Sequence, residues 1–502
     1  MQTNEGLSAL DSVLEEKNTE AVMYLPSKKT PEYFVLVSKQ RQAVKLLKDE
    51  RFRVYLVDKS AFVDDVFKAS YAEVLAHRLL LPFKALKGEG LLQQLEKSYK
   101  REIVFQLVKD LVAEHKVAAV NLVIEPRYFL HEKIRRLMEV LPMMRSDLAE
   151  ALAEDENVLR GFEEAASAYV DEGLLVKVDE GFSPTHEAVS RLNKIPVLGI
   201  PEQLRRLNII KASKVFSLLM FEMVFERPSQ QSFLEDPEQF VYLRTARGLQ
   251  ALSKQLDMME FVREFFGGEA RIRRIGGLFN STYVIEVDST KLFAKRYLSW
   301  TDVKWIAARI WTAWVKGFSI DPATRLAKEI YFRDYLRNHG FNTSEVVHVN
   351  WRDKILYTNY IEGRSLLESW LEKSADRHVF AEKTGQLLAR IHDAGVRLGD
   401  CKPESFIRAE DGRMFVTDLE QSSFDGDPAW DLMELIFYPG HYLEADEAAA
   451  LAEQITEGYL EVGKPEVVKK SLKPGYVRTM SLWTPPWVQI AVVDRVKQVL
   501  RA

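Results

Sequence analysis

Short apolar runs near the start of the chain are typical of β-strands, and longer repeats typical of helices follow them. Runs of β-branched and aromatic residues lie at 34–37 and 53–57. They flank a stretch at 42–50 with a helical pattern. Apolar residues then recur at intervals of three and four over 73–86 and 91–115, which predicts two long helices. We therefore expect an N-terminal α/β domain over residues 1–140.

The next segment, 145–189, has the pattern helix, turn, helix, strand, turn, strand, helix. The turn between the two strands is an acidic-Gly turn at 179–181, and Asp147 is a suitable cap for the first helix. This order predicts a winged-helix-like module over residues 141–195. Such modules bind nucleic acid or dock proteins, and both roles stay open because the second helix is acidic and therefore a poor reader of the major groove.

Residues 196–267 are interpreted as a helical linker. Breaks lie at Pro196, Gly199, Pro201 and 228–237. A helix is predicted over 248–266, and Gly267–Gly268 would cap it and act as a hinge.

Residues 271–297 change to the pattern strand, Gly-containing turn, strand, tight turn, strand. Gly276 and Gly277 permit a polyanion to approach the backbone, and Asn280 and Ser281 offer hydrogen bonds at the turn. A Gly-Gly turn in a hairpin can equally be only a turn. Lys295, on the third predicted strand, could reach phosphates held under the first turn.

Two aspartates follow at a spacing that suits phosphoryl transfer. Asp400 and Asp418 each end or follow a strand-like run, and Lys402 comes two residues after Asp400. One carboxylate orients an attacking hydroxyl, the Lys neutralises the moving group, and the second carboxylate holds a metal ion. Taken singly, both are ordinary turn acids. Glu329, on a helix predicted over 325–340, is a carboxylate that can pair with Lys295.

In this order the residues resemble the eukaryotic-like kinase superfamily, especially RIO kinases and the kinase subunit of the KEOPS complex. The resemblance rests on residues 388–407, 416–424 and 428–437. It implies a bilobal protein-kinase-like catalytic domain over 268–502 that uses ATP and Mg²⁺. The implied roles are ATP binding for Gly276, Gly277, Asn280, Ser281, Lys295 and Glu329, catalysis for Asp400 and Lys402, metal binding for Asp418 and Ser405, and support of the catalytic loop for Asp431.

The chain departs from that family at three places. Leu398 replaces the usual His two residues before the catalytic Asp, and Ser405 replaces the second metal-binding Asn. Leu419–Glu420 replaces the Phe-Gly that follows the metal-binding Asp. A non-catalytic nucleotide-binding scaffold is therefore one alternative. An active kinase is the preferred interpretation, because Asp400, Lys402 and Asp418 are all present.

The acceptor of the phosphoryl group is expected to be RNA. Only about a dozen residues separate Asp418 from Asp431, which leaves no peptide-gripping activation segment. The layout resembles archaeal RNA kinases that phosphorylate a ribose 2′-hydroxyl of tRNA, and this implies tRNA or another structured RNA as substrate. An atypical RIO-like protein Ser/Thr kinase is the main alternative, and a small-molecule kinase is a further one.

Two basic and aromatic segments bear on that expectation. The segment 297–325 interleaves Trp300, Trp305, Trp311 and Trp314 with Lys304, Arg309, Lys316 and Arg325. Such a pattern can bind phosphates and stack bases, or its tryptophans can pack on the kinase lobe. Near the C-terminus, the turn Trp483–Trp487 lies within a basic stretch that either caps the lobe or extends an RNA path.

Composition narrows the class of protein. The 502 residues (57.8 kDa) are 47% hydrophobic and 28% charged, as in a globular protein of several domains. A single Cys excludes a disulfide framework and fits a reducing cytosol. No apolar run reaches the ~18 residues of a membrane helix, and the N-terminus is polar and acidic. We expect a cytoplasmic α/β and α+β multidomain protein without a membrane partner. Its net charge of −5 argues against a protein that coats nucleic acid with a uniformly basic surface.

Overall fold

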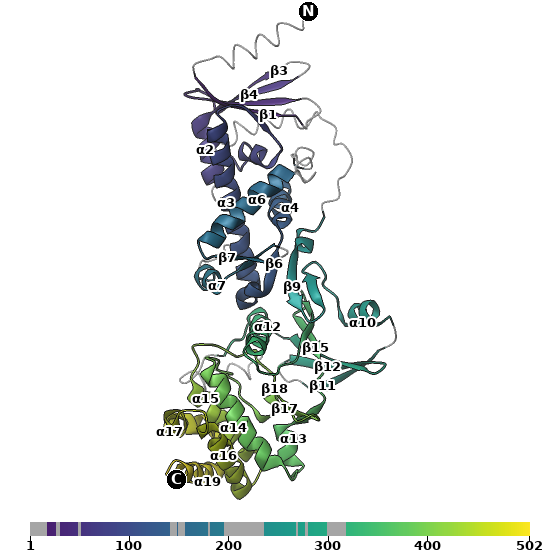
Figure 1. Ribbon diagram of the computed structural model, residues 1–502, viewed down its shortest axis with the longest axis vertical. Helices are drawn as coiled ribbons and strands as arrows, with labels where there is room; N and C mark the ends of the chain where they lie inside the picture. The colour runs from purple at the N-terminus through teal and green to yellow at the C-terminus, as the bar shows by residue number, and fades with distance from the viewer. Residues whose placement is uncertain are drawn as a thin grey trace, which may run out of the picture. The chain divides into compact units, whose positions relative to one another are not determined.

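The computed structural model divides the chain into two compact units. The described residues are 18–26, 31–48, 52–140, 148, 156–178, 181–194, 235–267, 270–276, 280–298 and 318–501. The first unit comprises Met1–Glu114, Ala119–Leu243 and Ala251–Ser253, and the second comprises His115–Ala118, Arg244–Gln250 and Lys254–Ala502. Figure 1 shows the course of the chain through both units.

A five-stranded sheet begins the first unit. Its strand order is β3 (Val44–Lys48), β4 (Arg53–Asp58), β2 (Glu32–Val37), β1 (Thr19–Leu25) and β5 (Lys84–Lys87). β2 and β4 run parallel, and the other neighbours are antiparallel. The helical stretch predicted at 42–50 is wrong, because β3 pairs with β4 with Val44 opposite Val57. Pairing with a neighbouring strand outweighs the local helical pattern there.

One of the two predicted long helices is present. α3 (Glu89–His115) confirms the helix predicted over 91–115, whereas 73–86 forms η1 (Ala76–Leu80) and part of β5 instead. Pro82 cannot continue a helix, and residues 84, 85 and 87 pair with β1 as part of β5 instead. The turn before η1 is held by Asp65, in α2 (Lys59–Lys68), whose carboxylate is fully buried. This carboxylate accepts hydrogen bonds of 2.8–3.0 Å from the backbone N–H groups of Tyr71, Glu73, Leu75 and Ala76. Burial raises the pKa of Asp65 to about 6. The bound N–H groups precede or begin η1, so this carboxylate caps the turn that leads into η1.

The elements expected for the winged helix appear in the predicted order where the structure describes them. They are α6 (Glu156–Asp171), β7 (Leu175–Val178), β8 (Gly181–Pro184) and α7 (His186–Leu192). Thr185 caps α7 by accepting a hydrogen bond from Ala188 N at 3.1 Å. Asp147 and most of the first predicted helix lie outside the described residues, so the winged-helix module stays a prediction.

The helical linker is corrected over its described part. Residues 195–234 lie outside the described residues, but β9 (Val241–Thr245) and β10 (Gly248–Ala251) form a hairpin. The sheet order is β10-β9-β6-β8-β7, with β6 at Leu122–Ile124. The helix predicted over 248–266 is therefore restricted to α10 (Met258–Phe266). Asp257 and Glu260 form a capping box at its start, and Gly267 ends it with a φ of +65°.

The second unit contains a five-stranded antiparallel sheet. Its order is β11 (Arg271–Gly276), β12 (Asn280–Val287), β13 (Thr290–Tyr297), β15 (Ile355–Asn359) and β14 (Val346–Asn350). These strands confirm the strand pattern predicted over 271–297. α12 (Pro322–Asn338) follows β13 in the described chain, and α10 packs Phe261 and Val262 into the core of the sheet.

Helices make up most of the remaining lobe. They are α13 (Leu366–Leu371), α14 (Arg377–Asp393), α15 (Pro428–Phe437), α16 (Ala445–Leu460), α17 (Pro465–Ser471), α18 (Pro474–Thr479) and α19 (Pro486–Val499). A small sheet, β16 (Gly363–Ser365), β17 (Phe406–Ala409) and β18 (Met414–Val416), lies before α15 in the chain. Among the described residues, no helix is long and apolar enough to cross a membrane.

Two glycines let α14 and α16 cross closely. A Cβ atom on Gly385 would lie 2.0 Å from Ile455 O, and one on Gly458 would lie 2.0 Å from Glu382 O. Both distances are impossible for real side chains, so the crossing requires glycine on each helix.

A buried histidine predicts acid sensitivity of the second unit. The ring of His348 lies among those of Phe261, Phe265 and Tyr357, at centroid distances of 5.4–5.8 Å. Burial, aided by Lys254, lowers the pKa of His348 to about 4. Between pH 6.5 and 4 the imidazole of His348 takes up a proton in the unfolded chain but not in the folded chain. The free energy of unfolding therefore decreases as the pH is lowered through this range. From pH 7 to pH 5 His348 should cost about 2 kcal/mol of unfolding free energy.

Substitution of His348 with Phe, which suits the aromatic surroundings, should remove that part of the acid sensitivity. All nine tryptophans lie within residues 300–487 of the second unit, so their fluorescence during denaturant unfolding at pH 7 and pH 5 reports on it. The exposed His339→Phe variant is the control and should keep the wild-type difference between the two pH values. An unchanged difference in His348→Phe would contradict the prediction.

Candidate functional site

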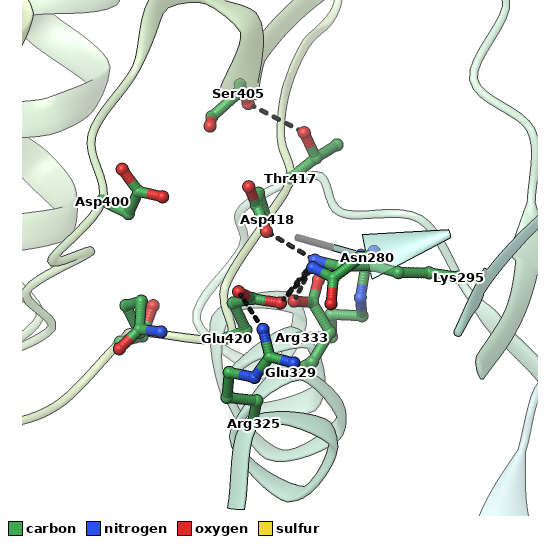
Figure 2. Close-up of polar contacts among 12 residues, drawn as sticks. Asn280, Lys295, Arg325, Glu329, Arg333, Asp400, Ser405, Thr417, Asp418 and Glu420 are labelled. Carbon is green, nitrogen blue, oxygen red and sulfur yellow. Dashed lines mark hydrogen bonds and ion pairs between the residues drawn. The ribbon is translucent and has the colours of Figure 1, made fainter. Parts of the chain in front are cut away.

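A buried lysine surrounded by three carboxylates forms the centre of the site. Lys295 Nζ lies 2.5 Å from Asp418 Oδ1, 3.0 Å from Glu420 Oε2 and 3.3 Å from Glu329 Oε2. Figure 2 shows the three carboxylates converging on the ammonium group. The structure thus brings together Lys295, Glu329 and Asp418, which the sequence analysis singled out, and adds Glu420.

The elements explain why these side chains meet. In the register of β12, β13 and β15, Lys295 lies opposite Thr282 and Leu356. α12 begins at its cap Asp321 and presents the fully buried Glu329 to Lys295. One turn later on α12, Arg333 forms an ion pair with the other oxygen of Glu329. Glu329 is therefore fixed between two cations.

Glu420 and Arg325 are site residues that the sequence analysis did not identify. Arg325 Nη1 lies 3.3 Å from Glu420 Oε1, and Arg325 Nη2 donates a 2.7 Å hydrogen bond to Leu298 O. Arg325 was one of the cations of the 297–325 segment that could bind phosphates, but its side chain is fully buried in this network of ion pairs. The four-residue spacing of Arg325, Glu329 and Arg333 along α12 was the signal that could have revealed Arg325, whereas no local signal indicates Glu420.

The charges of the cluster compensate one another. Burial disfavours the ammonium form of Lys295, but attraction to Asp418, Glu329 and Glu420 outweighs burial and raises its pKa well above the usual value. Burial also opposes ionisation of Asp418, yet Lys295, Lys402 and Arg333 lower its pKa. Burial, with repulsion from Asp418, raises the pKa of Glu420. Asp418 is therefore the carboxylate best kept ionised.

The loop that carries Asp400 is braced by Asp431 from α15. The Asp431 carboxylate accepts hydrogen bonds from Leu398 N at 2.6 Å and Gly399 N at 2.7 Å. His392 Nε2 lies 3.1 Å from the same carboxylate. Asp431 thus holds the loop through backbone groups and needs no side-chain donor at Leu398, while its predicted role in catalysis stays a prediction.

Asp400 itself is paired with Lys402. Lys402 Nζ lies 2.8 Å from the Asp400 carboxylate, and Lys402 also lowers the pKa of Asp418. In Figure 2, Asp400 stands apart from the Lys295 cluster, with Asp418 on the side of the cluster nearest to it. The two aspartates therefore lie on separate loops, and the positive charge of Lys402 stabilises the ionised form of Asp418 while it pairs with Asp400.

Ser405 and Asp418 are brought near each other by the ends of β17 and β18. Thr417 N donates a 2.8 Å hydrogen bond to Ser405 O, directly before Asp418 in the chain. Asp418 has a φ of +59°, in the left-handed region that Asp tolerates better than most residues. The buried Ser405 side chain is thus beside the loop of Asp418, and its metal-binding role stays a prediction.

The turn between β11 and β12 is described only in part. Gly277 lies outside the described residues. A Cβ on Gly276 would lie 3.5 Å from Thr282 Oγ1, so packing alone does not require glycine there. Asn280 Nδ2 donates a 2.9 Å hydrogen bond to Glu420, and Ser281 is buried opposite Arg296. Their expected ATP-binding role is therefore untested, and Asn280 joins the turn to the carboxylate cluster.

The donor set suits a hard divalent cation. One oxygen from each of Glu329, Asp418 and Glu420 lies within 4.8 Å of the others. Carboxylate oxygens are preferred ligands of Mg²⁺. Asp418 is the best placed of the three, because its side chain is the most exposed.

Comparisons with known proteins give fold-level similarity only. No family model and no curated protein matches the chain. Among solved structures, choline kinase LicA from Streptococcus pneumoniae is 16% identical, with a TM-score of 0.26, and the match covers 48% of this chain and 96% of that one. A thermostable mutant of aminoglycoside phosphotransferase APH(4)-Ia, in a ternary complex with AMP-PNP and hygromycin B, is 13% identical. Its TM-score is 0.28, and the match covers 49% of this chain and 98% of that one.

The four tryptophans of the 297–325 segment lie outside the described residues, and so do Lys304, Arg309 and Lys316. Base stacking and phosphate binding by these residues stay a prediction. The described site consists of a sheet lobe that supplies Lys295, a helix that supplies Glu329, and two aspartate loops in a helical lobe. The described chain is a mixed α/β protein of two compact units, and each of the two matches covers about half of it.

Proposed function

We propose that this protein is an ATP-dependent RNA kinase that transfers the γ-phosphate to a ribose 2′-hydroxyl of tRNA. The observation that carries the proposal is the separation of the two aspartates. Asp418 belongs to a buried cluster with Lys295 and Glu329, whereas Asp400 pairs with Lys402 on a loop braced by Asp431. Phosphoryl transfer needs these two centres, one for the phosphates and one for the acceptor.

Each residue has a role that follows from its contacts. Lys295, oriented by Glu329, binds the α- and β-phosphates of ATP. Asp400 accepts a hydrogen bond from the acceptor hydroxyl and receives its proton. The hydroxyl oxygen forms a bond to the γ-phosphorus while the bond to the β-phosphate oxygen breaks, and ADP leaves. Lys402 balances the negative charge that develops near Asp400.

Asp418, with Glu420 and Ser405 as further candidates, would hold Mg²⁺. When bound, this ion neutralises negative charge on the phosphates. The residues of the chain prepare the site by burying the cluster and excluding water from Lys295.

Two observations support RNA as the acceptor. The chain between Asp418 and Asp431 is short, with α15 beginning at Pro428, so little of it is available to grip an extended peptide. The preceding unit contains α6, β7, β8 and α7, which are the described part of a predicted winged helix, a module that holds nucleic acid in many proteins. A folded RNA is the substrate that a multidomain kinase of this kind can hold at more than one point.

A non-catalytic nucleotide-binding scaffold is the second candidate, and Glu420 favours it. Glu420 adds an ion pair to Lys295 that a glycine would not make, and this carboxylate competes with phosphates for the ammonium group. In that case ATP binds without turnover.

The test is incubation with γ-labelled ATP and Mg²⁺, with total tRNA added or omitted. Wild type should label tRNA, and Asp400→Asn should lower the rate by about 10²- to 10⁴-fold, because the amide cannot accept the proton. Asp393→Asn, an exposed Asp at the end of α14, is the matched control and should retain the wild-type rate. Label on protein alone would replace this function with a RIO-like protein kinase, and ATP binding without label would favour the scaffold.

A further inference from the structure

The C-terminal segment of the second unit exposes large apolar side chains. Trp487, in the first turn of α19, is 65% exposed, and Ile490, one turn later, is 63% exposed. Leu482, in η7 (Met480–Leu482), and Trp483 are exposed beside them. Burying such side chains is favourable, so a face of this kind is typical of a binding surface.

This face is fixed in place by the lobe beneath it. Thr484 Oγ1 donates a 2.9 Å hydrogen bond to Phe437 O, and His441 Nδ1 donates a 3.0 Å hydrogen bond to Trp483 O. A Cβ on Gly440 would lie 2.6 Å from both Thr484 and Val488, so η6 (Tyr438–His441) packs directly on the turn before α19. Pro485 and Pro486 further restrict the backbone that presents Trp487. The backbone that presents these rings is thus held in place by the lobe.

Aromatic rings connect the face to the catalytic loop. The rings of His441 and Tyr442 lie 4.5 Å apart, and those of Tyr442 and Tyr438 lie 5.9 Å apart. The Tyr438 hydroxyl donates a 3.4 Å hydrogen bond to Glu404, which is two residues from Lys402. A continuous series of contacts therefore runs from the loop of Asp400 to Trp483. We define the stacking face as Tyr438, His441, Tyr442, Trp483 and Trp487.

The charge of the surrounding chain is strongly positive. Residues 467–502 contain seven Lys or Arg and one acidic residue, Asp494, although the whole chain has a net charge of −5. Lys469, Lys473 and Arg478 are exposed, and Lys470 lies 2.8 Å from Asp427, just before α15. Rings flanked by cations complement a chain that carries both bases and phosphates.

We propose that the stacking face binds an unpaired segment of the RNA acceptor, with bases on its rings and phosphates at Lys469, Lys473 and Arg478. The inference rests on the proposed function and deepens it, because it assigns a surface that leads RNA toward Asp400. Exposed rings with basic neighbours favour RNA over an apolar peptide, which would leave these cations without partners.

The test measures RNA binding without ATP, by fluorescence anisotropy of a labelled, unstructured oligoribonucleotide. Trp487→Ala should weaken binding at least about fivefold, and Trp487→Phe should restore most of it, because base stacking needs a ring. Met259→Ala, at another exposed apolar residue of the same unit, should bind as wild type does. Lys473→Gln should reduce the slope of log K against log salt by about 0.7.

Transfer kinetics separate this inference from the proposed function. With labelled ATP, Trp487→Ala should raise KM for RNA by the same factor and leave kcat unchanged, since Trp487 does not touch the reacting atoms. Unchanged RNA affinity in Trp487→Ala and Lys473→Gln, with RNA still phosphorylated, would overturn the stacking face and retain the kinase. Loss of affinity in Trp487→Ala, with no label ever entering RNA, would overturn the kinase and support the face.

Discussion

Replacing Asp418 with Asn should lower the rate of phosphoryl transfer by about a thousandfold or more. The amide lacks the charge that would hold Mg²⁺ beside the phosphates, and it no longer balances Lys295 at 2.5 Å. Apart from Gly, Asn is among the residues that best tolerate the φ of +59° at this position, so the substitution tests charge with little added backbone strain.

The measurement is the initial rate of transfer across a range of Mg²⁺ concentrations. Asp425→Asn makes the same change at an exposed position seven residues later and should keep the wild-type rate. If Asp418→Asn retained more than a tenth of the wild-type rate at saturating Mg²⁺, Asp418 would not be the metal-binding carboxylate.

Glu420→Gln should lower the unfolding free energy of the second unit by about 3 kcal/mol. The stabilisation of this unit by bound ATP should nevertheless be larger in the variant than in wild type. Gln keeps hydrogen bonds but removes the charge that Arg325 and Lys295 share, which leaves buried positive charge uncompensated. The phosphates of ATP would replace the missing negative charge at Lys295. Bound ATP should therefore raise the unfolding midpoint further in the variant than in wild type.

Denaturant unfolding followed by tryptophan fluorescence, with and without ATP, measures both effects. Glu410→Gln, at an exposed position between β17 and β18, is the matched control and should change neither quantity. An equal or smaller ATP response in Glu420→Gln would show that Glu420 does not compete with phosphates for Lys295.

The site was more predictable from sequence than the elements that surround it. Lys295, Glu329, Asp400 and Asp418 were identifiable because phosphoryl transfer requires these residue types in one order along the chain. Glu420 was noted only as a departure from a pattern. Its partners lie 95 to 140 residues away in the chain, and nothing local indicates that Arg325 and Asn280 would meet it.

The mistaken elements share a physical cause. β3 and β9 each pair with a neighbouring strand that local periodicity cannot reveal, so their apolar residues were interpreted as helical. The segment 73–86 fails as a helix because Pro82 interrupts it and residues 84, 85 and 87 pair with β1 as part of β5. In contrast, α3 and α10 carry their own signals, a long apolar repeat and a capping box with a terminal glycine, and both were predicted.

The glycine crossing of α14 and α16 limits how this lobe can evolve. Gly385 and Gly458 lie on the helices whose His392 and Tyr459 are joined by a 2.9 Å hydrogen bond, and His392 also contacts Asp431. A mutation of either glycine separates the helices and disturbs the brace of the Asp400 loop at once. No single second mutation restores the lost space on both sides. Related sequences that keep catalysis should therefore retain both glycines while the exposed faces of the same helices diverge freely.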